Sequence, residues 1–346
     1  VIYFHDSASG HLAMERLFFE CNVRLISYYL DPDIKITYEN IYNQYKLYQN
    51  LEVYINLEIK KHKFLDFIQG DIIIYVTRDP ISRLKTHINH IYPKDEFLVN
   101  ITLEDDPSKI LNCTCFLNNS SNISVEFLDV FLKEKKDTVF MINNHYVDFL
   151  NSHNIFFMDM KDIDCDNAFD TMCMLSKKFH FKAPSLSSLT VFKTRMTGVF
   201  DFILPKILCI NLDDVNVRII ITTLNRTVGD FLDVTKEFIY DTLEYKNLVL
   251  YMTREDYKIL KQYNDIFKKC QEYLHDFIRK LIIKVNYEQS KKIDEIQILK
   301  YLRANNELKV LLKNILDQEL IYIKNHRPDI VASWKYYQEF EKICRE

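Results

Sequence analysis

Glycine, proline and tryptophan are scarce in this chain of 346 residues, which contains four glycines, seven prolines and one tryptophan. The complete GxxxxGK[ST] motif of an ATP-binding loop is absent. No apolar run reaches the roughly 18 residues that a membrane-spanning helix requires, and no signal-peptide pattern opens the sequence. We therefore expect a cytoplasmic protein without a transmembrane segment.

Zinc-site spacing and a strong net charge are missing too. The eight cysteines include no CxxC pair and no matching histidine spacing, so we expect reduced thiols and no metal. The 45 basic and 49 acidic residues give a net charge of −4, which provides no general attraction to nucleic acid or to an anionic membrane. Any anion-binding site must therefore be local.

What the sequence does contain is an alternation of apolar strand patterns with amphipathic helix patterns. We expect buried strands at 1–4, 53–59, 72–76 and 154–160, and helices at 12–20, 125–135, 144–152 and 166–181. Such alternation predicts an α/β fold with a central parallel sheet that helices cover on both faces.

The rest of the chain follows different patterns. Prolines and an Asn/Ser-rich run mark an irregular insertion at about 92–124 within a core of residues 1–205. Apolar strands at 206–212, 217–224 and 247–253 predict a strand-rich addition or flap over 206–253. Residues 254–346 are charged and helical in pattern, so we expect a mainly helical C-terminal region.

Polar residues follow three of the predicted strands. Ser7, Ser9, Gly10 and His11 form a small-residue turn before a helix, where backbone N–H groups and hydroxyls can bind an anion. By itself such a turn is more typical of a helix cap. His62, after Lys60 and Lys61, can act as a base towards a hydroxyl, although most loop histidines are simply solvated.

The third cluster is the segment RDPISRLKT, which follows the apolar run 72–76. The guanidinium of Arg78 offers a planar fork for anion oxygens, and Thr86 adds a hydroxyl in the helix that follows. Alone, an arginine at a strand end is more typical of a surface position. Because the carboxyl ends of parallel strands form the ligand crevice of an α/β sheet, the three clusters together favour a phosphate site.

These segments resemble the sulfotransferases that use 3′-phosphoadenosine 5′-phosphosulfate, in particular the carbohydrate-modifying branch. The family pattern R-D-P-x-x-R-L-x-S matches RDPISRLKT, which also contains Arg83. The resemblance extends over about residues 1–185. The whole chain is also similar to a group of uncharacterised bacterial proteins labelled sugar transferases.

The resemblance implies a three-layer P-loop-like fold and transfer of a sulfuryl group to a hydroxyl of a surface glycan or glycolipid precursor. Arg78 and Thr86 would hold the donor's 3′-phosphate. The turn with Ser7, Ser9, Gly10 and His11 would hold its 5′-phosphosulfate, and His62 would be the catalytic base, without a metal. Ala8 stands where the family has a lysine that stabilises charge developing on the bridging oxygen.

Two alternatives remain open. A nucleotide-sugar glycosyltransferase commonly uses a D-x-D metal site, and Asp164-Cys165-Asp166 has this form, although acidic residues there also suit a helix start. A non-catalytic binding protein that retains the fold is the other alternative, and Ala8 favours it. Trp334 is more typical of a buried docking anchor than of a sugar platform.

Overall fold

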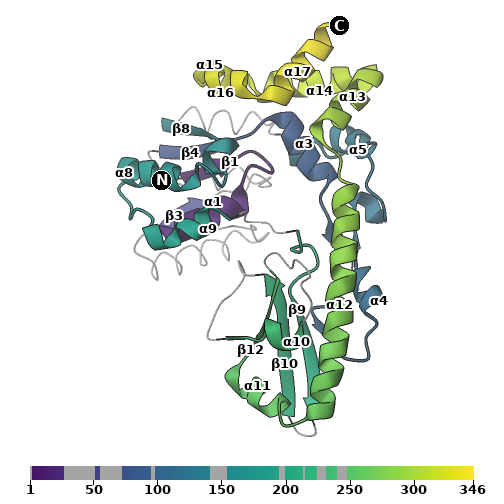
Figure 1. Cartoon of the computed structure of the whole chain (residues 1–346). Coiled ribbons are helices and arrows are strands. Elements are labelled where there is room, and N and C mark those ends of the chain that lie inside the picture. The colour runs from purple at the N-terminus through teal and green to yellow at the C-terminus, as the bar shows by residue number, and fades with distance from the viewer. Residues whose placement is uncertain are drawn as a thin grey trace, which may run out of the picture. The chain divides into compact units, whose positions relative to one another are not determined.

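The computed structural model describes residues 2–26, 51–54, 72–94, 98–140, 154–194, 199–212, 215–223, 231–239 and 248–346. These residues form two compact units (Figure 1). Unit 1 comprises Val1–Ile88, Ser124–Met196 and Ile293–Glu346, and unit 2 comprises Asn89–Ile123 and Thr197–Lys292. The division differs from the three segments expected from the sequence. The insertion joins the strand-rich segment, and the helical C-terminal region divides at Lys292.

Unit 1 is built on a five-stranded sheet in which every neighbouring pair is parallel. The order is β2-β3-β1-β4-β8. The strands are β1 Ile2–His5, β2 Arg24–Ile26, β3 Leu51–Tyr54, β4 Ile72–Thr77 and β8 Asn154–Asp159. The first strand therefore lies in the middle of the sheet, and the chain leaves it towards both edges.

The helices of unit 1 fall into two groups along the chain. The first group belongs to the strand–helix alternation and comprises α1 His11–Glu20, α3 Pro80–Ile88, α5 Phe127–Lys133, α6 Lys136–Val139, α8 Ala168–Phe179 and α9 Leu189–Phe192, with the short 3₁₀ helices η3 Met160–Ile163 and η4 Leu186–Ser188. The second group is C-terminal and comprises α13 Glu295–Ala304, α14 Asn306–Glu319, α15 Ile321–His326, α16 Pro328–Ser333 and α17 Lys335–Arg345.

Helices cover both faces of this sheet. On one face, Ile74 and Val76 of β4 pack with Leu17 of α1 and with Met172 and Leu175 of α8 in one buried cluster. On the other face, the ring of Phe157 in β8 lies 6.0 Å from Tyr322 and 6.2 Å from His326, both in α15. Because side chains alternate along a strand, neighbouring strand residues supply both faces. The sheet is therefore buried on each side, as parallel sheets usually are.

The C-terminal helices are attached where β4 and β8 end. Trp334, which is 3% exposed, donates its indole N–H to Asp159 Oδ2 at 2.9 Å. The backbone N–H groups of Tyr336 and Tyr337, in the first turn of α17, donate to Asp79 Oδ2 at 2.9 and 3.1 Å. Trp334 is thus a buried anchor, as its sequence context predicts.

Unit 2 contains a second five-stranded sheet, in the order β11-β12-β10-β9-β6. Its strands are β6 Asn100–Ile101, β9 Lys206–Leu212, β10 Val215–Thr223, β11 Leu232–Asp233 and β12 Leu248–Met252, and a separate pair is formed by β5 Tyr92–Pro93 and β7 Thr114–Cys115. β9 and β10 pair antiparallel, with Val215 opposite Leu212, and β12 pairs antiparallel with β10. Among the described strands of this sheet, only β6 runs parallel to its neighbour, β9.

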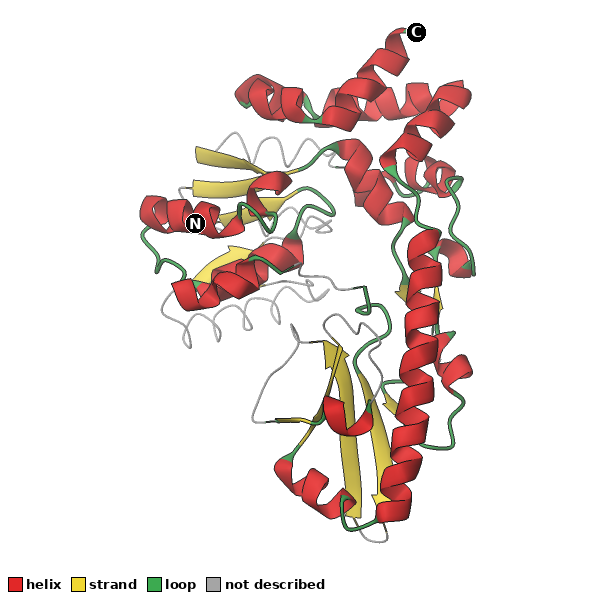
Figure 2. Cartoon of the chain, viewed as in Figure 1, coloured by secondary structure: helices red, strands yellow, loops and turns green. Residues whose placement is uncertain are grey.

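A long helix covers one face of this second sheet (Figure 2). The helices of unit 2 are α4 Pro107–Leu111, η2 Leu117–Asn119, α10 Thr235–Phe238, α11 Arg254–Leu260 and α12 Asn264–Ser290. Leu274, Phe277 and Leu281 of α12 share one buried cluster with Ile210 of β9 and Ile219 of β10. Their spacing of three and four residues places them on one helical face.

The mixed α/β class, the parallel sheet and the helical C-terminal region expected from the sequence are confirmed. The expectation of an irregular stretch over 92–124 is wrong in part, because β5, β6, β7 and α4 lie within it. The helix expected at 144–152 lies outside the described residues. Within the described ranges, no helix combines the length and apolarity that crossing a membrane requires.

The single tryptophan provides a probe for the attachment of the C-terminal helices. We expect Asp159→Ala to lower the free energy of unfolding by roughly 1–3 kcal/mol, because the buried indole N–H of Trp334 loses its acceptor. Urea unfolding followed by tryptophan fluorescence measures this change. Asp166→Ala removes an exposed carboxylate nearby and should leave the midpoint unchanged. Equal midpoints for the two variants would contradict the anchoring role.

Candidate functional site

The loop between β1 and α1 is a tight turn that aims the first turn of a helix at the carboxyl edge of the sheet. Ala8 and Gly10 have φ values of 58° and 79°, in the left-handed region. A side chain at Gly10 would also bring its Cβ within 2.6 Å of Ile163 Cδ1 and 2.7 Å of Met160 Sδ. Both φ and space therefore require glycine at this position.

The serines of this loop differ in what they can offer a ligand. Ser9 is fully buried, its N–H donates to Asp6 O at 3.1 Å, and its hydroxyl points back to Ser7 O at 3.5 Å. Ser7 is only half-buried. Among the described residues, the backbone N–H groups of Ala8 and Gly10 donate no hydrogen bond. These two N–H groups, and the Ser7 hydroxyl if it gives up its bond with His87 Nε2, are the loop donors that suit an anion.

Asp6 ties the end of β1 to the end of β4. Its buried carboxylate accepts hydrogen bonds from Tyr75 Oη at 2.6 Å, Thr77 Oγ1 at 2.7 Å and the backbone N–H of Arg78 at 3.1 Å. Burial raises the pKa of Tyr75 well above its ordinary value, and the Asp6 carboxylate raises it further. The phenol therefore remains protonated and acts as a donor to Asp6.

Arg78 lies against the β1–α1 loop, as the sequence predicts for two parts of one site. Its Nη1 donates to Ala8 O at 2.6 Å. Burial lowers the pKa of the guanidinium below its ordinary value, although Glu295 opposes this effect. The residue stays half-buried. The contact between Arg78 and the loop joins two predicted anion-binding segments that are 70 residues apart.

The remaining predicted site residues are Thr86, His11 and His62. The Thr86 hydroxyl donates to Ser82 O at 3.1 Å, one turn earlier in α3, so its proton is used within the helix. The backbone of His11 begins α1, whereas its side chain is not described. Lys60, Lys61 and His62, including the predicted base, lie outside the described residues.

His87 is the site residue that the sequence analysis missed. Its Nε2 lies 2.8 Å from Ser7 Oγ, which brings the imidazole of α3 to the β1–α1 loop. The only sequence signal was its position directly after Thr86 in the predicted phosphate-binding helix. That position becomes meaningful only once α3 is seen beside the loop.

Arg83 matches the sulfotransferase pattern, but its guanidinium is completely buried. Its Nη2 donates to Glu319 Oε1 at 2.8 Å and to Val139 O, and its Nη1 lies 3.6 Å from Asp6 Oδ2. Burial alone would lower the pKa of Arg83, yet Glu319 and Asp6 raise it above its ordinary value. Arg83 therefore holds the loop, α3 and α14 together within the protein interior.

The acidic residues at the end of β8 and just after it accept hydrogen bonds from backbone N–H groups. Asp159 Oδ1 accepts from the N–H of Lys161, and Asp164 Oδ1 accepts from the N–H groups of Asp166 and Asn167 at 3.0 Å each. Asp164 of the D-x-D sequence thus stabilises the turn that leads into α8. In the described part of the chain, no group of three His, Cys, Asp or Glu side chains is arranged to hold a metal ion.

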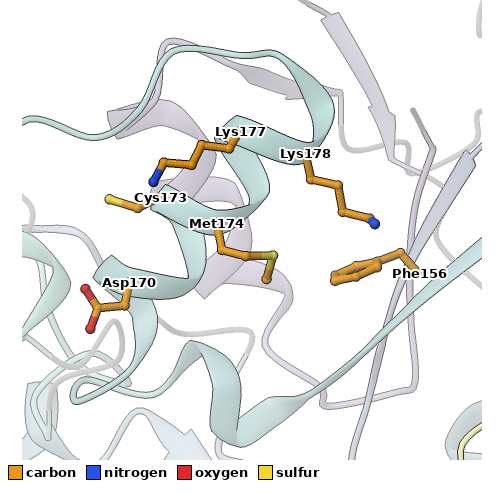
Figure 3. A pocket seen from close by; sticks show the side chains of 6 residues that line it. All are labelled: Phe156, Asp170, Cys173, Met174, Lys177 and Lys178. Carbon is orange, nitrogen blue, oxygen red and sulfur yellow. The ribbon is translucent and has the colours of Figure 1, made fainter.

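A separate hollow of about 660 Å³ lies between α8 and β8 (Figure 3). Phe156, Asp170, Cys173, Met174, Lys177 and Lys178 line it. Lys178 reaches towards the Phe156 ring, with its Nζ 5.0 Å from the ring centroid, whereas Lys177 points away. None of the predicted site residues lines this hollow.

Comparison with known proteins gives one match. The family model described as "Protein of unknown function (DUF2972)" matches residues 157–346, which is more than half of the chain. The chain belongs to this family. No curated protein and no solved structure matches.

The region matched by the DUF2972 model begins inside β8 and contains α8, most of unit 2 and all the C-terminal helices. The β1–α1 loop, Arg78 and His87 precede it. Glu319, Asp159 and Trp334 lie within it, and each contacts a residue or strand of unit 1 described above. Among the described strands of the parallel sheet, the matched region therefore contains only the second half of β8, and it depends on the preceding residues for the other strands.

The buried arginine generates a prediction for stability. We expect Arg83→Met to lower the free energy of unfolding by about 3–5 kcal/mol, because it leaves the carboxylates of Asp6 and Glu319 buried without their cation. Chemical denaturation followed by circular dichroism measures the loss. Arg303→Met removes only the exposed ion pair with Glu346 and should cost less than about 1 kcal/mol. A similar loss in both variants would show that the Arg83 pairing is not specially important.

Proposed function

We propose that this protein is a sulfotransferase-like enzyme that transfers a sulfuryl group from 3′-phosphoadenosine 5′-phosphosulfate to a hydroxyl of a surface glycan or its precursor. The observation that carries the proposal is the contact between Arg78 Nη1 and Ala8 O at 2.6 Å. It brings together the two segments that the resemblance assigns to the two ends of one donor. A ligand with anionic groups at both ends is suited to such a pair.

The strand order supports the same location. In an open parallel sheet, ligands bind outside the carboxyl ends of the strands where the chain changes direction across the sheet. In the order β2-β3-β1-β4-β8, the chain leaves β1 for one edge and β4 for the other. The β1–α1 loop and Arg78 stand at these two neighbouring strand ends, which is also consistent with a three-layer P-loop-like fold.

In this proposal the loop and the first turn of α1 hold the 5′-phosphosulfate through backbone N–H groups, aided by the hydroxyl of Ser7, with Ser9 and Gly10 shaping the turn. Arg78 and Thr86 hold the 3′-phosphate, and for this purpose the Thr86 hydroxyl would exchange its bond with Ser82 O for a phosphate oxygen. Arg78 would exchange its bond with Ala8 O for the donor's oxygens, which form stronger charge-assisted bonds. His62 keeps its proposed role as a base.

The resemblance leads one to expect a lysine at position 8, where this chain has Ala8. The charge that develops on the bridging oxygen therefore lacks this cation. Lys85 is not available for this purpose while its Nζ lies 2.6 Å from Glu295 Oε1. A binding protein that retains the site without transferring sulfate is therefore the second candidate function. The D-x-D carboxylate of Asp164 stabilises a helix start, so we do not propose a glycosyltransferase.

Calorimetric titration with 3′-phosphoadenosine 5′-phosphate tests the donor site. We expect the wild-type chain to bind it and Arg78→Ala to bind roughly tenfold to 100-fold more weakly, since a hydrogen bond to a charged group contributes about 1.5–3 kcal/mol. Arg218→Ala, at an exposed position in unit 2, is the matched control and should bind like the wild type.

Two outcomes would count against this proposal. Absence of binding to the wild-type chain rejects the donor, and equal affinity of Arg78→Ala and the wild type rejects the role of Arg78. Binding without any transfer of labelled sulfate to a glycan acceptor would favour the second candidate function.

A further inference from the structure

Ser7 and His87 form a hydroxyl–imidazole pair in the candidate site, with 2.8 Å between Ser7 Oγ and His87 Nε2. The two residues are 80 positions apart and come from different elements, the β1–α1 loop and α3. A histidine nitrogen at this distance can take the proton of a serine hydroxyl, which is the arrangement that activates serine nucleophiles.

The surroundings hold the imidazole in place. The His87 ring lies 5.6 Å from the ring of Phe131 in α5, tilted by 54°. Phe131 is buried, whereas Ser7 and His87 are each half-buried. The pair is thus supported from the protein side and remains accessible to a small substrate.

The loop also offers groups that suit an anion on Ser7. The N–H groups of Ala8 and Gly10, which have no acceptor among the described residues, follow Ser7 directly, and α1 begins immediately after them. Negative charge at the start of a helix is stabilised by the helix dipole. A sulfuryl ester on Ser7 would carry its charge at this position.

We infer that Ser7 is a nucleophile, activated by His87, that accepts the sulfuryl group from the donor before the acceptor hydroxyl does. This inference rests on the proposed function. It gives the enzyme a two-step transfer in which His87 takes up the proton of the Ser7 hydroxyl.

In the first step, a bond forms between Ser7 Oγ and sulfur while the bond from sulfur to the donor's phosphate oxygen breaks. The serine proton moves to His87 Nε2, and 3′-phosphoadenosine 5′-phosphate leaves. In the second step, the acceptor oxygen bonds to sulfur and the Oγ–S bond breaks. His87 returns its proton to Ser7 Oγ, and the acceptor hydroxyl gives its proton to the base of the proposed function.

Diisopropyl fluorophosphate tests the nucleophile independently of the donor. Ser7 Oγ would bond to phosphorus, fluoride would leave, and the serine proton would pass to His87. We expect peptide mass spectrometry of the full chain to locate the label on Ser7. His87→Gln keeps a hydrogen-bonding side chain that cannot act as the base, so its labelling should be slower by roughly 100-fold. Exposed His90 provides the control, and His90→Gln should be labelled at the wild-type rate.

A second experiment follows the transfer of the sulfuryl group itself. Rapid quenching after mixing with 3′-phosphoadenosine 5′-phosphosulfate should yield a peptide in which Ser7 carries one SO₃ group, and Ser7→Ala should yield none. Absence of this adduct, or fluorophosphate labelling of His87→Gln at the wild-type rate, overturns the inference. Calorimetry separates the two proposals: if the bisphosphate binds but Ser7 is unmodified, the donor site survives and the serine nucleophile does not.

Discussion

The buried cation of Arg83 is the constraint on which unit 1 depends. A guanidinium removed from water is tolerated only when opposite charges and acceptors surround it, and Asp6, Glu319 and Val139 O supply them. These groups come from the loop after β1, from α14 and from the end of α6. One arginine side chain therefore requires three distant segments to meet at α3, and the candidate site forms beside this meeting point.

At the carboxyl edge of the sheet, some polar groups attach the C-terminal helices and others belong to the candidate site. Asp79 follows β4 and Asp159 ends β8, and both carboxylates accept hydrogen bonds from residues at the start of α17 or just before it. Asp6 is used internally as well. Among the described residues at this edge, Ser7, Ala8, Gly10, Arg78 and His87 are half-buried, and these residues make up the candidate site.

The DUF2972 match separates the same two sets of residues. The matched region carries Glu319 and Trp334, which hold the C-terminal helices against the sheet, whereas the candidate reactive groups precede it. The two parts depend on one another through charge. Arg83 is the cation that meets both buried carboxylates, Asp6 of the preceding part and Glu319 of the matched region.

Much of the fold could be predicted because its signals are local. The apolar runs at β4 and β8 and the amphipathic spacing of α8 reflect burial along a short stretch of chain, and the polar residues that follow β1 and β4 lie at one edge of the sheet. The short strands of the insertion were missed, since two residues are too few to show a periodicity.

The roles of individual polar residues could not be predicted in the same way. Arg83 and Arg78 lie on one sequence motif, yet one is enclosed by carboxylates and the other faces the loop. His87 was marked only by its position directly after Thr86. The sequence by itself determined β1, β3, β4 and β8, their parallel arrangement and helices such as α1 and α8, but not the three-residue β2, because hydrophobic periodicity acts over neighbouring residues and needs several of them. Only the tertiary structure decided which of those groups are buried and which meet, because burial and pairing depend on residues as distant as Asp6 and Glu319.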